Sequence, residues 1–141
     1  MSSLVPYNTG GADLSAYVGY LLAADPAGAG DFALIPMAAV TDRPAAALVG
    51  FLANATQDPI FVEFGLVELV AGATPPAYLD AVAAAADGSV VPALGAKAGS
   101  WLIGQCLSAG AAAGDLITVL LDLTALRQLY LRTPFDYDRH F

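Results

Sequence analysis

The chain has 141 residues, of which 57% are hydrophobic and 13% charged, and its formal net charge is −8. This length fits one domain, or one domain with arms. The acidic balance argues against direct binding of nucleic acid, which needs clustered Lys and Arg. No segment offers the roughly 20 mostly apolar residues of a transmembrane helix, and the first residues lack the regions of a signal peptide. We therefore expect synthesis and folding in a cytoplasm.

Turn-forming residues divide the chain into short apolar segments. Glycine (14 residues) and proline (9 residues) recur along its whole length, and the segments between them have the length of strands rather than helices. After an arm at 1–15, the predicted strands lie within 32–37, 46–52, 60–70, 78–82, 89–94, 101–107 and 116–123. This spacing predicts an all-β fold, a small antiparallel β-barrel or sandwich of about eight short strands.

The segment 77–87 allows two interpretations. Its sequence, AYLDAVAAAAD, holds four consecutive alanines, and alanine is the best helix former. A short helix is therefore one alternative. We favour a strand that runs into a turn, because Asp87 and Gly88 form a hairpin signal before the next apolar residues.

A weak internal repeat relates the segment 17–64 to the segment 78–121. Each reads as a hairpin, then a strand with two apolar residues before a glycine, then a small-residue turn, then a strand that is apolar on both faces. In this match 48–50 corresponds to 102–104, and 60–64 corresponds to 117–121. The repeat predicts two similar four-strand halves that close on each other and so remove exposed sheet edges.

The last segment differs from the rest. Leu123, Leu126 and Tyr130 fall at helical spacing with Thr124 as a candidate N-cap, which predicts a short helix before a tail. The domain division is therefore an arm at 1–15, a β-barrel at 16–122, and a helix with tail at 123–141. In the tail, aromatic and charged residues alternate over 135–141, a pattern that suits a strand added to the sheet edge of a neighbour.

Residues for catalysis are scarce. The single His, His140, has no assembled Ser-His-Asp partners, and no phosphate-loop or metal-binding motif is present. Cys106 is the only cysteine, so no internal disulfide or cysteine metal cluster exists, and its apolar surroundings favour a buried, inert thiol. We expect no enzymatic activity, no cofactor and no metal.

Several polar or aromatic residues instead indicate contacts with a partner. Glu63 and Glu68 lie within an apolar run, either at solvent-facing strand positions separated by a bulge at Gly65 or as one half of an interface ion pair with Arg43 or a partner's arginine. Pro44 holds Arg43 extended. The candidate partner or oligomer contacts are Asp42, Arg43, Glu63, Trp101, Arg127, Tyr130, Arg132, Phe135, Tyr137 and Arg139.

The segment 116–121, LITVLL, is apolar at both strand parities. Ile117, Val119 and Leu121 share one face, and Leu116 and Leu120 share the other with Thr118. A strand that is apolar on both faces needs two covers. We expect one face to meet the protein's own core and the other a second copy, with the assignment of the two faces left open.

Four short motifs resemble those of one known family. TDRP at 41–44, DGSVVP at 87–92, IG at 103–104 and AGDLI at 113–117 are similar to the pattern of small capsid decoration (cement) proteins of tailed bacteriophages, the DUF2190-like β-barrel type. The resemblance covers roughly residues 31 to 122, leaving the arm and the tail outside it.

The resemblance implies a viral structural protein without enzymatic activity. Such proteins bind the outer surface of the phage head, commonly as trimers, and stabilise contacts between subunits of the major capsid protein. It implies the virion as location, a homo-oligomer, no direct contact with nucleic acid and no membrane. The alternatives are another virion component, such as a head fibre base or a tail decoration, and a β-barrel carrier with an apolar ligand inside its lumen.

Overall fold

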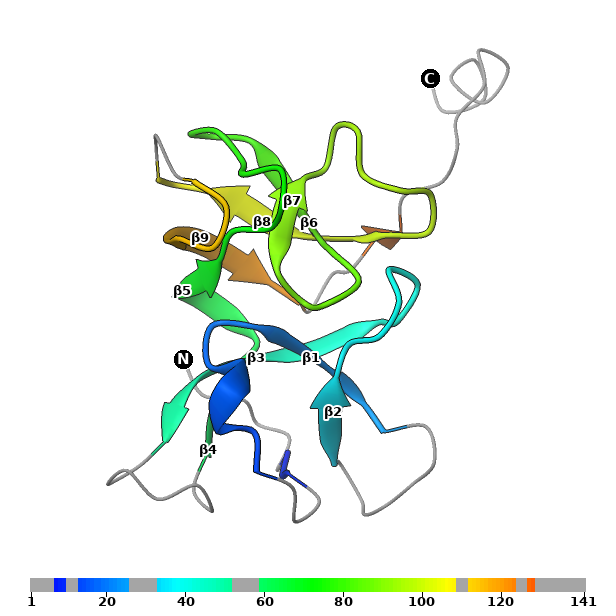
Figure 1. Cartoon of the computed structure of the whole chain (residues 1–141), viewed down its shortest axis with the longest axis vertical. Coiled ribbons are helices and arrows are strands. Elements are labelled where there is room, and N and C mark those ends of the chain that lie inside the picture. The colour runs from blue at the N-terminus through cyan, green and yellow to red at the C-terminus, as the bar shows by residue number, and fades with distance from the viewer. Residues whose placement is uncertain are drawn as a thin grey trace.

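Two antiparallel sheets make up the protein, so the predicted all-β fold is confirmed. The computed structural model describes residues 7–9, 13–25, 33–51, 59–108, 112–123 and 127–128. Figure 1 shows the first sheet below the second, with η1 (Ser15–Tyr17), a single 3₁₀ turn, beside the first. The chain passes from one sheet to the other only once within these residues, between β4 and β5.

The first sheet has the strand order β2-β1-β3-β4. Its strands are β1 (Leu21–Ala24), β2 (Leu34–Pro36), β3 (Pro44–Phe51) and β4 (Pro59–Val62). The second sheet has the order β5-β9-β8-β6-β7, with β10 paired to β8. Its strands are β5 (Phe64–Val70), β6 (Ala81–Ala84), β7 (Val90–Pro92), β8 (Trp101–Cys106), β9 (Leu116–Asp122) and β10 (Arg127–Gln128).

The strand pairings repeat between the two sheets. The path β2-β1-β3-β4 has the same connectivity as β7-β6-β8-β9. Both paths carry a register shift at the same place, where Leu22 pairs with Ala46 in the first sheet and Val82 pairs with Gly104 in the second. The predicted repeat is therefore present as two similar four-strand units, with β5 added to the second.

The register corrects the sequence match inside the repeat. We matched 48–50 with 102–104, but the pairings make Ala46 the equivalent of Gly104. Val62, which pairs with Ala47, is likewise the equivalent of Leu120, which pairs with Gln105. The sequence match aligned the two segments because both contain Leu, an apolar residue and Gly in that order. The two glycines have different roles: a Cβ on Gly104 would clash with the backbone of β9, whereas a Cβ on Gly50 would meet no atom.

The preferred interpretation of 77–87 is confirmed. Ala81–Ala84 form β6, and the chain then turns so that the Gly88 N–H donates to the Ala85 carbonyl. Two of the four consecutive alanines, Ala83 and Ala84, lie in this buried strand, because β7 and β8 pair on both sides of it. The other two belong to the turn that follows. Tertiary pairing here overrides the helix propensity of alanine.

The predicted helix in 123–141 is wrong where the structure describes it. Arg127 and Gln128 form β10 and pair with Leu102 and Trp101. The first half of β8 has no partner from β9, because β9 pairs only from Gly104 onward, so its free backbone groups are satisfied by β10. Residues 124–126 and 129–141 lie outside the described residues.

The expected bulge at Gly65 is also wrong. β5 pairs with β9 without a register shift from Phe64 to Val70, and Gly65 stands directly opposite Leu121. The break instead falls at Glu63, between β4 and β5, where the chain leaves the first sheet for the second. Glu68 is exposed, as the solvent-facing interpretation expected.

Two hydrophobic clusters fill the units. The first unit has its own cluster, which includes Leu22, Leu34 and Leu48. The larger cluster lies inside the second unit and also takes side chains from the opposite face of the first sheet, among them Leu21 and Val62. The outer face of the first sheet is therefore buried against the second unit, which excludes its apolar area from water.

Candidate functional site

The outer face of β5 and β9 is apolar and open to solvent. Four large side chains lie on it, with exposed fractions of 65% for Leu66, 59% for Leu116, 44% for Phe64 and 41% for Leu120. Leu66 stands directly opposite Leu120 in the register, so these are neighbours on one surface. Single exposed apolar residues are ordinary, whereas a contiguous group marks an interaction site. We call these four residues the β5–β9 outer face.

The open question about the two faces of 116–121 is now answered. Ile117, Val119 and Leu121 are at most 1% exposed and belong to the core. Leu116 and Leu120 point to the other side. The face that needs a second cover is therefore the face with Thr118. At one end of it the backbone at Gly19 lies beside Leu116, while Leu66 and Leu120 stay exposed.

The polar residues at this face are few. Glu68 is exposed and stands opposite Thr118. Gln105, next to Leu120 in the register, donates a hydrogen bond of 3.1 Å from its side-chain nitrogen to the Leu79 carbonyl. Asp122 lies on the same side of β9, opposite Phe64. The face thus offers two carboxylates beside its apolar side chains, and no arrangement of acid and base for catalysis among the described residues.

β5 is an edge strand, and its outer edge borders the β5–β9 outer face. β5 pairs with β9 alone, and Ala71, just after it, bonds toward the β9 side through Asp115. Antiparallel pairing alternates the direction of backbone groups, so the N–H and C=O groups of Leu66 and Glu68 point away from β9. The Val70 N–H at the end of this edge donates to Gly19, while within the described residues no strand pairs with the edge at Leu66 and Glu68.

Arg43 and Trp101 form a second candidate surface. The Arg43 guanidinium carbon lies 5.5 Å from the centroid of the Trp101 ring, a cation–π contact. The Trp101 Nε1 donates a hydrogen bond of 3.1 Å to the Thr41 carbonyl. These contacts join the turn before β3 to the start of β8, so they link the two sheets. We call Thr41, Arg43 and Trp101 the Arg43–Trp101 corner.

Tyr7 and Glu63 lie near this corner. Burial raises the pKa of the Tyr7 hydroxyl, and the negative charge of Glu63 and a hydrogen bond with it raise the pKa further, while the positive charge of Arg43 lowers it. Each effect follows from which form of the phenol its neighbour favours. The Tyr7 ring also packs edge-on against Phe61, with 6.3 Å between ring centroids.

The fold thus brings together part of the predicted contact set. Arg43 contacts the Trp101 ring, and Arg43 and Glu63 both act on the Tyr7 hydroxyl. Strand β10, which contains Arg127, pairs with the start of β8 at Trp101 and Leu102. The Asp42 carboxylate accepts the backbone N–H groups of Ala38 and Ala39 at 2.9 and 3.1 Å, so it stabilises the turn before β3. The remaining predicted contacts lie outside the described residues; they are Tyr130, Arg132, Phe135, Tyr137 and Arg139.

Sequence reasoning missed Phe64 and Leu66 as surface residues. The signal was available in the segment 64–70, FGLVELV, which is apolar at both parities like 116–121. Two neighbouring strands with this property give a sheet with two apolar faces, of which only one can enclose the core. The sequence pattern alone does not tell which strands are neighbours.

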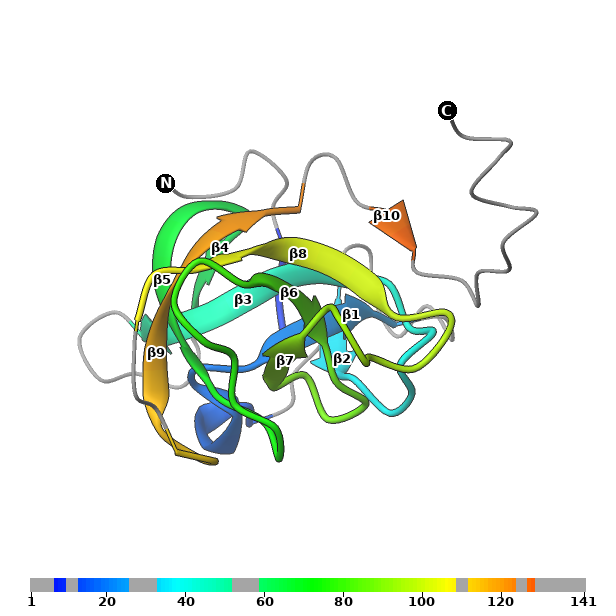
Figure 2. The same cartoon turned by 90° about the horizontal axis from the view of Figure 1, so that it is seen from above.

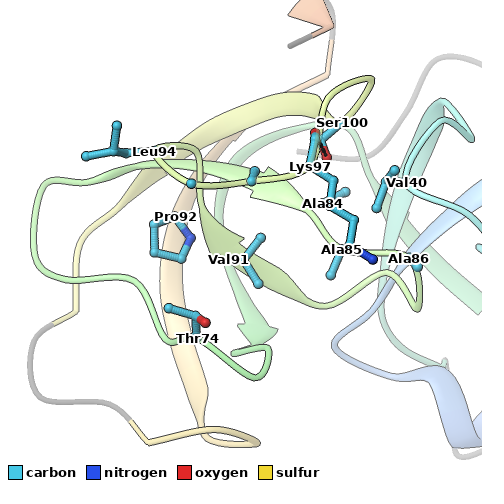
Figure 3. Close-up of a pocket in the computed structure, with 12 residues that line it drawn as sticks. Val40, Thr74, Ala84, Ala85, Ala86, Val91, Pro92, Leu94, Lys97 and Ser100 are labelled. Carbon is cyan, nitrogen blue, oxygen red and sulfur yellow. Dashed lines mark hydrogen bonds between the residues drawn. The ribbon is translucent and has the colours of Figure 1, made fainter. Parts of the chain in front are cut away.

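A pocket of about 320 Å³ lies beside β6 and β7. Figure 3 shows Val40 on one side of it and Pro92 and Leu94 on the other. Its polar groups include the Lys97 amine and the Ser100 hydroxyl, which donates to the Lys97 carbonyl at 2.6 Å. The lining comes from neither 60–64 nor 116–121, the segments that the carrier interpretation places around a lumen.

The remaining chemical groups are structural. Cys106 is buried, as predicted, and its thiol lies 3.3 Å from the Ser108 carbonyl. Among the residues described, no three His, Cys, Asp or Glu side chains gather as a metal site. The same residues include no helix that is both long and apolar enough to span a membrane.

Comparison with known proteins adds no relative to these observations. No protein-family model matches the sequence, and no curated protein matches it.

Proposed function

We propose that this protein is a capsid decoration protein of a tailed bacteriophage. It binds the outer surface of the head and stabilises contacts between subunits of the major capsid protein. The observation that carries this proposal is the β5–β9 outer face, an apolar sheet surface on a chain without a catalytic constellation among its described residues. A surface of this kind suits assembly with other proteins.

The positions of the resembling motifs support the proposal. TDRP at 41–44 leads into β3 and contributes Thr41 and Arg43 to the Arg43–Trp101 corner. DGSVVP at 87–92 forms the turn into β7, and AGDLI at 113–117 forms the turn into β9. The motifs therefore coincide with turns and strand starts, the expected place for a scaffold pattern, and TDRP and AGDLI adjoin the two surfaces.

The two surfaces suit different contacts. The apolar outer face loses water-exposed area on docking and so favours association. Arg43 is an exposed cation on an acidic chain, held in place by the Trp101 ring, and it offers a donor fork to a carboxylate of the shell. We place the capsid contact at the Arg43–Trp101 corner and the contact between copies at the outer face.

A reconstitution experiment tests this function. Purified protein is added to expanded phage heads that lack decoration, and bound protein is measured after sedimentation of the heads. We expect saturable binding, with heads that resist heat or chelation better than bare heads. Arg43→Glu should reduce the affinity about tenfold or more, because it places a carboxylate where a cation docks.

The matched control is Lys97→Glu, which makes the same charge change at a cation that lines the pocket with Val40 and Ser100 and has no contact with the Trp101 ring among those described. Equal loss of binding in both variants would show that net charge, and not the corner, governs attachment. Absence of binding to any expanded head, with the protein folded, would refute the proposed function.

A further inference from the structure

We infer that the pocket beside β6 and β7 binds a small carboxylate with an apolar body. We call this cavity the Lys97 pocket, after the one cation among the described residues that line it. None of these residues belongs to the β5–β9 outer face or to the Arg43–Trp101 corner. The inference therefore goes beyond the proposed function and does not depend on it.

The Lys97 pocket lies where the two units meet. Val40 comes from the turn before β3, whereas the other described lining residues come from the second unit, mainly from β6, β7 and the loop 93–100. Ligand pockets commonly lie at such contacts between structural units. The volume of about 320 Å³ is near the lower end of the usual range for ligand pockets, roughly 300–1,000 Å³. A cavity of this size suits a small ligand.

Small side chains leave the space of the pocket open. Alanine is depleted in strands because it packs little surface against its neighbours, yet alanines occupy the end of β6 and the turn after it. Figure 3 shows Ala84 and Ala85 between Val40 on one side and Val91 on the other. Val40, Val91 and Pro92 are each only partly buried. An apolar ligand that covers these walls is removed from water together with them, which favours binding.

Lys97 gives the pocket a positive charge on an acidic chain. The chain has 13 Asp and Glu residues against five Lys and Arg, yet no carboxylate lies among the described residues that line the pocket. Asp87, which follows the lining residue Ala86, accepts hydrogen bonds from the backbone N–H and the hydroxyl of Ser89. Within the part of the chain that the structure describes, Lys97 has no ion pair. An anion in the pocket therefore meets a cation that has no competing carboxylate among these residues.

Ser100 fixes the loop that carries Lys97. The backbone N–H and the hydroxyl of Ser100, a residue that is 1% exposed, both donate to the Lys97 carbonyl, at 3.1 and 2.6 Å. Gly95 and Gly99 have φ values of 88° and 89°, which glycine adopts without the steric cost that other residues incur. The main chain at Lys97 is therefore held beside the pocket, while the long side chain stays free to reach an anion.

One ammonium group and apolar walls favour a singly charged ligand. A carboxylate carries one negative charge, which one ammonium can pair. A phosphate monoester carries close to two charges and offers three acceptor oxygens, more than a single amine satisfies. We expect the carboxylate at Lys97 and the apolar body against Ala84 and Val91. A free acid and the C-terminal residue of a protein chain share this chemistry.

An NMR titration of the ¹⁵N-labelled chain with hexanoate tests the inference. We expect saturable shifts at the amides of Val91, Gly95 and Lys97, with a dissociation constant on the order of 1 mM for a ligand of this size. Hexanamide lacks the charge and acetate lacks the apolar body, so each should bind about tenfold more weakly or less. A short peptide that ends in leucine, with its terminus free or amidated, identifies the source. Tighter binding of the free-terminus peptide than of hexanoate would assign the pocket to a chain terminus, and weaker binding would assign it to a free acid.

Substitutions separate the contribution of the charge from that of the cavity. Lys97→Gln should weaken hexanoate binding about tenfold and leave hexanamide binding unchanged, whereas Lys97→Arg should retain hexanoate binding because it keeps the charge. Ala85→Leu should abolish binding of both ligands by filling the space. The matched control is Ala81→Leu, the same change at an exposed position of β6 that does not line the pocket, and it should leave binding unchanged. Thermal unfolding shows that each variant is folded, and the Lys97 variants keep the test decisive if Ala85→Leu does not fold.

Three results would overturn the inference. They are an absence of saturable shifts with both hexanoate and the free-terminus peptide, equal affinities for hexanoate and hexanamide, and unchanged hexanoate binding in Lys97→Gln. A chain that binds expanded heads but none of these acids would refute this inference and leave the proposed function standing. A chain that binds hexanoate at the pocket but no head would do the reverse.

Discussion

The two units share connectivity and a register shift, yet their outer faces meet different surroundings. In the first unit, Val62 and Leu21 pack against the second unit. In the second unit, Leu120 and Leu66 face solvent. Val62 and its equivalent Leu120 are both apolar, whereas Ala47 is replaced by Gln105 in the second unit. At Leu120 the difference in exposure therefore comes from position and not from residue type. A repeat that stacks one unit on the next leaves one face uncovered, and here that face is the β5–β9 outer face.

The largest expected effect on stability comes from substitutions at Gly104 and at its equivalent, Ala46, which lie at the register shift that both units share. A Cβ on Gly104 would lie 1.9 Å from the Leu120 backbone oxygen, at a φ of +156°. Gly104→Ala should therefore lower the free energy of unfolding by about 3 kcal/mol or more. Ala46→Gly, at the equivalent place in the first unit, should cost about 1 kcal/mol. Urea unfolding of both variants measures the difference, and similar losses would refute the structural equivalence of their environments.

The next effect separates the covered face from the open one. Val62→Ala should lower the free energy of unfolding by about 2 kcal/mol, because it leaves a cavity between the units. Leu120→Ala should change it by less than about 1 kcal/mol in dilute protein, since much of this side chain is already in water. Chemical denaturation at low and high protein concentration checks this. A large loss for Leu120→Ala at every concentration would mean that the single chain covers this face.

The link between the sheets at the Arg43–Trp101 corner should contribute less. Trp101→Phe removes the hydrogen bond to Thr41 and weakens the contact with Arg43, which should cost about 1–2 kcal/mol. Arg43→Ala retains the hydrogen bond and should cost under about 1 kcal/mol. Thermal melts of the two variants show which of them loses more unfolding free energy. A larger loss in Arg43→Ala would mean that the cation–π contact, and not the hydrogen bond of Trp101, is the stronger link between the sheets.

The smallest effect concerns Tyr7 and pH. Its pKa is raised from the ordinary value of 10.0 by burial and then by Glu63, so the folded state holds this proton more tightly than the unfolded chain does. The resulting stability is complete below the ordinary value and is lost as pH rises through the raised pKa. Tyr7→Phe should flatten the fall in unfolding free energy above pH ~10. If the unfolding free energy of Tyr7→Phe fell with pH as it does in the unchanged chain, groups other than Tyr7 would be responsible for that decrease.

Much of the fold was predictable because glycine, proline and strand-length apolar runs mark strands locally. The sequence predicted the all-β class, the repeat, and a strand rather than a helix within 77–87, although the strand was expected at 78–82 and lies at 81–84. It did not predict the break at Glu63, since nothing in 60–70 marks where the chain changes sheet. Nor did it predict β10, because the pairing depends on the unpaired first half of β8. Both features arise from tertiary pairing, which local propensity does not encode.

The candidate surfaces were predictable to different degrees. Arg43, Glu63 and Trp101 stood out because charged and large aromatic residues are rare in this chain. Glu63 beside Arg43 was one of the expected alternatives. The meeting of Arg43 with Trp101 could not be inferred, because Trp101 and Thr41 are 60 residues apart and meet only through the topology. For 116–121 the need for two covers was visible in the sequence, while the choice of face required the neighbouring strand β5.

Trp101 is the only tryptophan of the chain, and it lies where the first sheet's turn, the start of β8 and β10 meet. The protein therefore carries a single indole, which can be excited separately from its six tyrosines, at the contact between its two units. Separation of the units would expose the indole and shift its emission to longer wavelength, even with each sheet intact. Time-resolved fluorescence could follow this opening without any attached label and distinguish it from complete unfolding.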